Sequence, residues 1–279
     1  MKSLESLFAE RKVIDSHVHI FPPRVFDAIW RYFETNYWPI NYKLYADQVA
    51  EELKKLGIRA FTTLNYAHKP GMARELNKFT FQFAQSYSEA IPMGTLHPGD
   101  KNVREVAEEA LTSYGFKGFK LQIMVTDFHL DDERLDPVYK VIVQEDGILT
   151  LHIGNGPLST PYVGFAHFKR FLAKYPALRI QIAHLGCFEH EKFFALIPEY
   201  PRLYFDTAMI YVNHTYFPSY LDLEPLFFIE FQDQIMFGSD FPNIPYEYEQ
   251  SYREFIKLDL PPKVFNKIFH QNAQTLYGI

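Results

Sequence analysis

Two histidines separated by one residue stand near the N-terminus, in the sequence Asp-Ser-His-Val-His at positions 15–19. Val13, Ile14, Val18 and Ile20 surround the motif and predict a strand over residues 13–20, in which alternate side chains point to the same face. His17 and His19 therefore share a face, and two imidazoles so placed can bind one metal ion. Asp15 lies on the same face but deeper, where we expect it to orient neighbouring groups without binding the ion itself.

Three further polar residues end or follow apolar runs. His152 ends Leu-Thr-Leu-His before Ile-Gly, His184 ends Ile-Ala-His before Leu-Gly, and Asp240 follows Phe-Gly-Ser. Each one alone has an ordinary explanation, because a histidine at a strand end is often a hydrogen-bonded structural residue and an aspartate after Gly-Ser can cap a turn. Four strands that all carry His or Asp at their C-terminal ends are harder to obtain by chance. In a (β/α)8 barrel such ends converge on one mouth, where these enzymes keep their active sites.

The elements that must position these residues alternate along the chain. Short apolar runs alternate with longer amphipathic stretches, which is typical of βαβ units and a parallel sheet. The predicted strands are Val13–Ile20, Ile58–Asn65, Ile91–Leu96, Gly118–Met124, Ile148–Ile153, Arg179–His184, Leu203–Thr207 and Ile235–Gly238. The predicted helices are Ala46–Leu56, Asn102–Tyr114, Asp132–Gln144, Phe165–Tyr175 and Pro262–His270.

These repeats predict the fold class. Units of about 30 residues are the size of one βαβ step, and 279 residues suit one large barrel. We therefore predict an α/β protein, a (β/α)8 TIM barrel that forms a single domain over residues 1–279. The segment Phe21–Tyr45 is rich in Trp, Tyr and Pro, and we expect it to be a long loop over the mouth of the barrel.

Taken in order, the motifs resemble those of the amidohydrolase-related family, the metal-dependent hydrolases and decarboxylases of the amidohydrolase superfamily. They are Asp-Ser-His-Val-His at 15–19, Leu-His-Ile-Gly at 151–154, Ala-His-Leu-Gly at 183–186, Phe-Gly-Ser-Asp-Phe-Pro at 237–242 and Asn-Ala-Gln-Thr-Leu-Tyr-Gly at 272–278. The resemblance implies a TIM barrel in which His17, His19, His152 and Asp240 bind one divalent metal ion. It implies zinc, with manganese as the alternative. It further implies that Asp240 moves protons, and that His184 polarises the substrate or assists proton transfer.

Four other residues are further candidates for the site. Binuclear members of the wider superfamily carry a carboxylated lysine on the fourth strand, where this chain has Lys120 in Gly-Phe-Lys-Leu-Gln. We expect a structural ion pair for Lys120 and a single metal ion. Trp38, Tyr66 and Gln122 are candidate substrate-binding residues, on the basis of their position in the sequence alone.

Such a site supports more than one activity. We favour hydrolysis of a small carbonyl compound, a lactone, ester or amide, by a metal-activated water. The alternative is non-oxidative decarboxylation of an aromatic or unsaturated acid at the same site. A third hypothesis is a barrel kept as a non-catalytic binding protein, and the complete ligand set argues against it.

Composition excludes several other classes. The net charge is −6 without a basic stripe, so we expect no nucleic-acid partner. No apolar run resembles a signal peptide or approaches the ~20 residues that span a bilayer, so we expect no membrane association. The single cysteine, Cys187, precludes a disulfide within the chain, and we expect a cytoplasmic enzyme with a small-molecule substrate. The 27 Phe and 19 Tyr residues are explained by core packing, and they are also compatible with a homodimer or an aromatic pocket.

Overall fold

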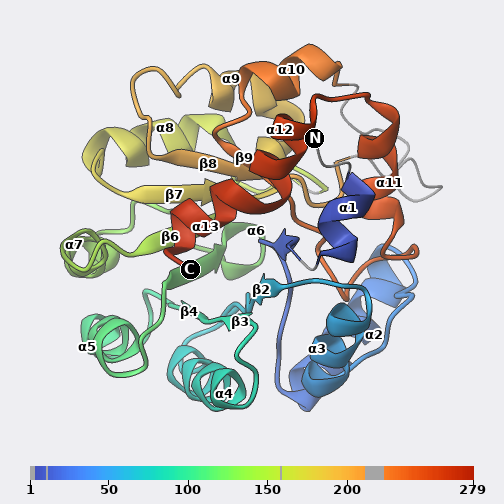
Figure 1. Cartoon of the computed structure of the whole chain (residues 1–279). Coiled ribbons are helices and arrows are strands. Elements are labelled where there is room, and N and C mark those ends of the chain that lie inside the picture. Colours follow the sequence, from blue (N-terminus) through green and yellow to red (C-terminus); the bar gives the residue numbers. More distant parts are fainter. Residues whose placement is uncertain (1–3, 11, 158, 211–222) are drawn as a thin grey trace. The chain divides into compact units, whose positions relative to one another are not determined.

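The structure is a computed structural model that describes residues 4–10, 12–157, 159–210 and 223–279. Within it the chain forms two compact units (Figure 1). The first unit comprises Met1–Thr63, Ser86–Ala90 and Asp206–Ile279, and the second comprises Leu64–Gln85 and Ile91–Phe205. The single domain over residues 1–279 stays a prediction.

The first unit is built on segments from the two ends of the chain. Strand β1 (Ile14–Asp15) pairs in parallel with β2 (Ala60–Thr62). Beyond β1, the Ser16 amide donates to the Phe237 carbonyl over 2.9 Å and the His19 amide donates to the Phe241 carbonyl over 2.7 Å. These bonds place the residues after β1 beside those that follow β9 (Ile235–Met236).

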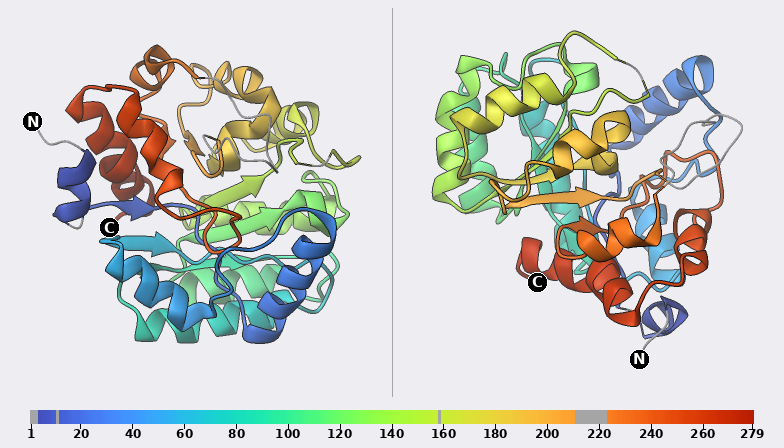
Figure 2. Two further views of the ribbon diagram at one scale, coloured as in Figure 1. Left: turned by 90° about the vertical axis from the view of Figure 1, so that its right-hand side faces the viewer. Right: turned by 90° about the horizontal axis from the view of Figure 1, so that it is seen from above.

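Helices surround these segments of the first unit. They are α1 (Leu4–Ala9), α2 (Pro23–Asn36), α3 (Ala46–Lys55), α10 (Pro225–Glu230), α11 (Gln250–Lys257), α12 (Pro262–Asn266) and α13 (Asn272–Tyr277), with a π-helical turn at Lys267–Gln271 between the last two. Figure 2 shows α1 against the C-terminal helices from two further sides, so the N-terminal helix packs on the end of the chain.

The second unit is a run of parallel strands in chain order. They are β4 (Met93–Thr95), β5 (Gly118–Gln122), β6 (Ile148–His152), β7 (Arg179–Ile182) and β8 (Leu203–Asp206). All five residues of β5 and of β6 are buried, as expected for parallel strands covered on both faces. A β-carbon on Gly118 would lie 1.8 Å from the Ile148 carbonyl oxygen, so only glycine fits where these two strands begin.

Six helices connect the strands of this unit. They are α4 (Ala73–Ser86), α5 (Val103–Glu108), α6 (Ile123–Thr126), α7 (Asp136–Gln144), α8 (Phe165–Lys174) and α9 (His190–Phe194). A π-helical turn at Glu109–Ser113 extends α5, and a short 3-10 turn at Glu133–Leu135 precedes α7. None of the described helices is long and apolar enough to cross a membrane.

Each predicted strand contains an observed one, but the observed strands are shorter. The predicted strand Ile91–Leu96 is divided into β3 (Ala90–Ile91) and β4, because Pro92 between them has no N–H to donate to a ladder. The predicted strand Gly118–Met124 ends at Gln122, and its last residues begin α6. His184 lies beyond the end of β7.

The prediction of a loop over Phe21–Tyr45 was wrong for its first half, which forms α2. Pro23 occupies the first turn of this helix, where a proline is tolerated because its missing N–H would have no helical partner. Phe26 and Trp30 are buried one turn apart, with ring centroids at 5.3 Å. This aromatic spacing is a helical signal that the Trp, Tyr and Pro content of the segment obscured.

Candidate metal centre

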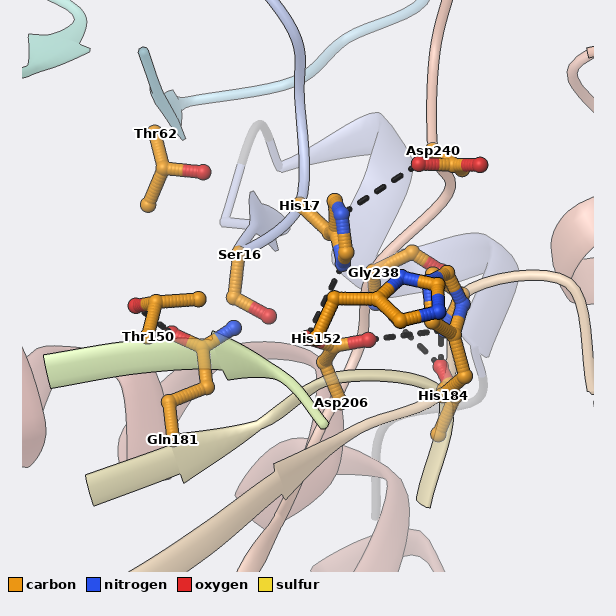
Figure 3. A network of polar contacts seen from close by, with 12 residues as sticks. Ser16, His17, Thr62, Thr150, His152, Gln181, His184, Asp206, Gly238 and Asp240 are labelled. Atoms are coloured by element: carbon orange, nitrogen blue, oxygen red, sulfur yellow. Dashed lines mark hydrogen bonds and ion pairs between the residues drawn. The ribbon is translucent and has the colours of Figure 1, made fainter. Parts of the chain in front are cut away.

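His17, His19 and Asp240 converge in the first unit, and they form a group that could hold a metal ion. Asp240 Oδ1 lies 2.9 Å from His19 Nε2 and 3.2 Å from His17 Nε2, the latter contact drawn in Figure 3. Ligand atoms bound at ~2.1 Å and at right angles to one another are ~3 Å apart, so this spacing suits a common ion. Two nitrogens and a carboxylate are also a donor set that zinc and manganese accept.

The backbone fixes this convergence. His17 and His19 alternate along the segment that follows β1, and the Asp240 amide donates to the His17 carbonyl over 2.9 Å. Asp240 itself has a φ of 71°, a left-handed conformation that aspartate adopts more readily than most residues. The Asp240 side chain is 14% exposed, against 1% for His17 and 7% for His19. Asp240 is therefore the member of this group that a small molecule can approach most easily.

Asp15 accepts four hydrogen bonds at the base of the group. Its Oδ1 accepts from the amides of His17 and Ser239 at 3.0 and 3.1 Å, and its Oδ2 accepts from the Ser239 and Tyr248 hydroxyls at 2.5 and 2.8 Å. Burial raises the pKa of Asp15 to about 7, although these hydrogen bonds lower it. Asp15 bonds to the backbone of His17 and to that of Ser239 beside Asp240, so it supports two candidate ligands through the backbone.

Asp206 is a buried neighbour of this group that the sequence analysis missed. Its Oδ2 lies 3.0 Å from His17 Nδ1, and neither side chain is more than 1% exposed (Figure 3). Asp206 is the last residue of β8, so it follows the same rule, a polar residue at the end of an apolar strand, that singled out His152. The predicted strand Leu203–Thr207 ran past this residue and hid the signal.

The second unit contains a cluster of polar side chains at the ends of β5, β6 and β7. His152 Nε2 lies 2.8 Å from the Gly156 carbonyl, and His152 Nδ1 lies 3.1 Å from both Gln122 Nε2 and His184 Nε2. A carbonyl only accepts, so His152 carries its proton on Nε2 and accepts on Nδ1. Gln122 stands directly opposite His152 in the register of β5 and β6. Its Oε1 is buried without a hydrogen-bond partner among the described residues.

His184 begins a turn in an unusual backbone conformation. His184, Leu185, Gly186 and Cys187 have φ values of 55°, 51°, 81° and 55°. Left-handed non-glycine residues are uncommon, and such strain concentrates at functional sites. The turn brings His184 back toward His152, with ring centroids at 4.6 Å.

The remaining predicted residues are dispersed. Trp38, in the first unit, is 5% exposed, and its indole N–H donates to the Asn243 carbonyl over 3.0 Å. Tyr66, in the second unit, is half-buried. Lys120 is fully buried in β5, with Thr95 and Thr150 opposite it on the neighbouring strands. The assignment of His152 to the metal centre, the structural ion pair of Lys120, and the substrate contacts of Trp38, Tyr66 and Gln122 all stay predictions.

The amino-acid sequence matches a known family. A family model described as amidohydrolase matches residues 14–279, nearly the whole chain. The chain belongs to the amidohydrolase family. The resemblance inferred from the motifs is thereby confirmed, as is an enzyme of the amidohydrolase-related type.

Solved structures similar to this amidohydrolase cover almost its entire length. A TIM-barrel protein from Bordetella bronchiseptica is 20% identical with a TM-score of 0.73, over 96% of this chain and 98% of that one. The 5-carboxyvanillate decarboxylase of Novosphingobium aromaticivorans, with bound manganese and 3-methoxy-4-hydroxy-5-nitrobenzoic acid, is 18% identical with a TM-score of 0.68, over 96% and 97%. The 2,6-dihydroxybenzoate decarboxylase from Rhizobium is 15% identical with a TM-score of 0.66, over 96% and 98%. No functionally curated protein matches the chain.

At such identities the likeness shows the fold, which is the predicted α/β TIM barrel. The family and the barrel are therefore shown, and His17, His19 and Asp240 form a group suited to a metal ion.

Proposed function

We propose that this amidohydrolase is a metal-dependent decarboxylase of a small aromatic acid that carries a hydroxyl group beside its carboxylate. The observation that carries the proposal is the convergence of His17 Nε2 and His19 Nε2 on one oxygen of Asp240. A divalent cation bound between these three atoms would be held by two imidazole lone pairs and one carboxylate charge. Similar barrels act on 5-carboxyvanillate and 2,6-dihydroxybenzoate, and one of them holds manganese. Both substrates are hydroxylated benzoates, which supports the substrate class.

The bound ion would neutralise the carboxylate and hydroxyl oxygens of the substrate and hold them in place. Asp240, the most exposed of the three, would deliver a proton from its carboxyl group to the ring carbon that bears the carboxylate. The bond to the carboxylate then breaks, its electron pair returns to the ring, and CO2 leaves. His17 and His19 hold the ion and take no part in the proton transfer.

His152 and His184 enter the proposal as predictions from the sequence. His152 is proposed as a further ligand, which requires that one of its ring nitrogens exchange its present hydrogen bond for the metal. His184 is proposed to polarise the substrate or assist proton transfer. The ion is zinc or manganese, and the cytoplasmic location and the homodimer likewise remain predictions.

Hydrolysis of a lactone, ester or amide is the second candidate. The motifs alone favour it, because a metal-bound water would have a pKa near ~7 and Asp240 could accept its proton. The two candidates share the same residues and differ in product, so a product assay separates them.

The test starts with metal content. Protein purified without chelators should contain about one equivalent of zinc or manganese by elemental mass spectrometry, and a His17→Ala/His19→Ala variant should contain none. The loaded enzyme is then given benzoates with hydroxyl groups ortho to a 13C-labelled carboxylate, and labelled CO2 is measured. Asp240→Asn should keep the fold and much of the metal yet lose most turnover.

Asp233→Asn is the matched control, because it removes a carboxylate from an ion pair with Lys267 outside the described site. Hydrolysis of lactones or amides, with no CO2 released from the benzoates, would overturn the decarboxylase proposal in favour of the hydrolase. Failure to bind any metal would refute both and revive the non-catalytic barrel. About two equivalents of metal per chain would indicate a second ion, with Lys120 as the ligand that bridges the two.

A further inference from the structure

Asp206 and His17 form a buried ion-pair contact behind the candidate ligand atoms. The carboxylate oxygen lies 3.0 Å from Nδ1 of the imidazole, on the opposite side of the ring from Nε2. A carboxylate only accepts hydrogen bonds, so Nδ1 donates its proton to Asp206, which leaves Nε2 as the nitrogen whose lone pair can bind a metal ion. Nε2 is the atom that faces Asp240. The contact thus selects the tautomer that a metal centre at His17, His19 and Asp240 needs.

The carboxylate of Asp206 is itself fixed in place. Its second oxygen, Oδ1, accepts from the Ala208 amide over 3.2 Å. The next residue, Thr207, donates its amide to the Met236 carbonyl over 3.0 Å, and its hydroxyl accepts from the Gly238 amide over 3.2 Å. The two bonds of Thr207 tie the end of β8 to the segment that leads to Asp240.

Gly238 lets the two side chains approach. A β-carbon on Gly238 would lie 2.8 Å from the Cβ of His17 and 3.2 Å from the Cβ of Asp206. His17 and Asp206 therefore meet across a residue that has no side chain, and no other residue fits there without displacing one of them. The segments that carry His17, Asp206 and Gly238 are far apart in the sequence and pack closely at this contact.

We infer that Asp206 is a positioning residue of the metal centre, which orients His17 and holds its Nε2 ready to bind the ion. The inference rests on the proposed metal centre and adds a residue to it. His19 is supported differently, because its ring stacks on Phe21 with centroids 5.8 Å apart. An aromatic neighbour restricts the plane of a ring, whereas a carboxylate also determines which nitrogen carries the proton. Asp206 is therefore expected to act on His17 specifically.

The test compares manganese affinity in wild type, Asp206→Asn and Asp233→Asn, by electron paramagnetic resonance of free Mn2+. Outer carboxylates that orient a histidine ligand typically change metal affinity by 10–100-fold. We expect a loss of roughly that size in Asp206→Asn and none in Asp233→Asn, which removes one exposed carboxylate. Raising the manganese concentration should restore most of kcat in Asp206→Asn but not in Asp240→Asn, because Asp206 acts only through the ligand.

A second measurement needs no variant at Asp206, in case that variant does not fold. Nitrogen-15 spectra of zinc-loaded wild type, with the His17 signal assigned by its loss in His17→Gln, should show Nδ1 protonated and Nε2 bound. The reverse pattern would overturn the inference, as would an Asp206→Asn variant that binds manganese as tightly as wild type. Absence of metal in wild type is a different result, which refutes the proposed function before any variant is compared.

Discussion

Removing the Tyr248 hydroxyl isolates one bond of the network that supports the candidate ligands. In Tyr248→Phe the ring still packs against Phe241, with centroids at 5.4 Å, but the 2.8 Å bond to Asp15 is lost. The acceptor is fully buried, so water does not replace the donor. A buried acceptor left short of a donor costs about 1–3 kcal/mol. For a protein of this size about 2 kcal/mol lowers Tm by ~4–8 °C.

The assay is thermal and urea unfolding followed by circular dichroism. Tyr45→Phe is the matched control, since the Tyr45 hydroxyl donates to Asp27 over 2.9 Å and the residue is 40% exposed. We expect a change within ~0.5 kcal/mol for this exposed bond. Equal losses of stability in the two variants, or a Tyr248→Phe protein with the Tm of wild type, would show that the bond from Tyr248 to Asp15 does not stabilise the fold.

Three further outcomes follow from the structure. Gly238→Ala should cost about 1–3 kcal/mol through overpacking and should weaken manganese binding, as unfolding with and without the metal will show; unchanged affinity would contradict the packing argument. Acidification below pH 6.5 should destabilise the protein, because burial lowers the pKa of His97 from 6.5, and the unfolded chain then binds more protons than the folded one. The stability that His97 contributes is present above pH 6.5 and is lost as the pH falls through the pKa of the folded state. The urea midpoint should therefore depend less steeply on pH in His97→Gln. An equal slope in the variant and in wild type would show that His97 does not cause the acid destabilisation. Manganese at 100 times its Kd should raise the free energy of unfolding by about 2.7 kcal/mol, and a shift that persists in His17→Ala/His19→Ala would place the metal elsewhere.

The positions of the strands were predictable because parallel strands buried on both faces are continuous apolar runs. Their ends were not, since Pro92 interrupts one run and residues after Gln122 turn into a helix. The helix α2 was missed because its signal is the spacing of aromatic residues in a segment whose composition suggested a loop.

The candidate ligands were predictable as polar residues at the ends of apolar strands, but their mutual contacts were not. Asp206 and His17 are 189 positions apart, and nothing in either local sequence says that they meet. The contact of Trp38 was equally invisible in the sequence, since its indole N–H donates to the backbone of the loop that follows Asp240, 205 positions away. Its substrate contact stays a prediction.

The candidate ligands His19 and Asp240 are separated by 221 positions, and the segment after β1 bonds to the backbone of Phe237 and Phe241. A ribosome that adds ~5–20 residues per second therefore needs on the order of 10–45 s between the synthesis of the first ligands and the last. During that interval the emerging chain exposes a His-x-His pair that lacks its carboxylate. An ion bound by all three candidate ligands would therefore enter the site only after Asp240 has been synthesised, too late to organise the folding of the N-terminal segment.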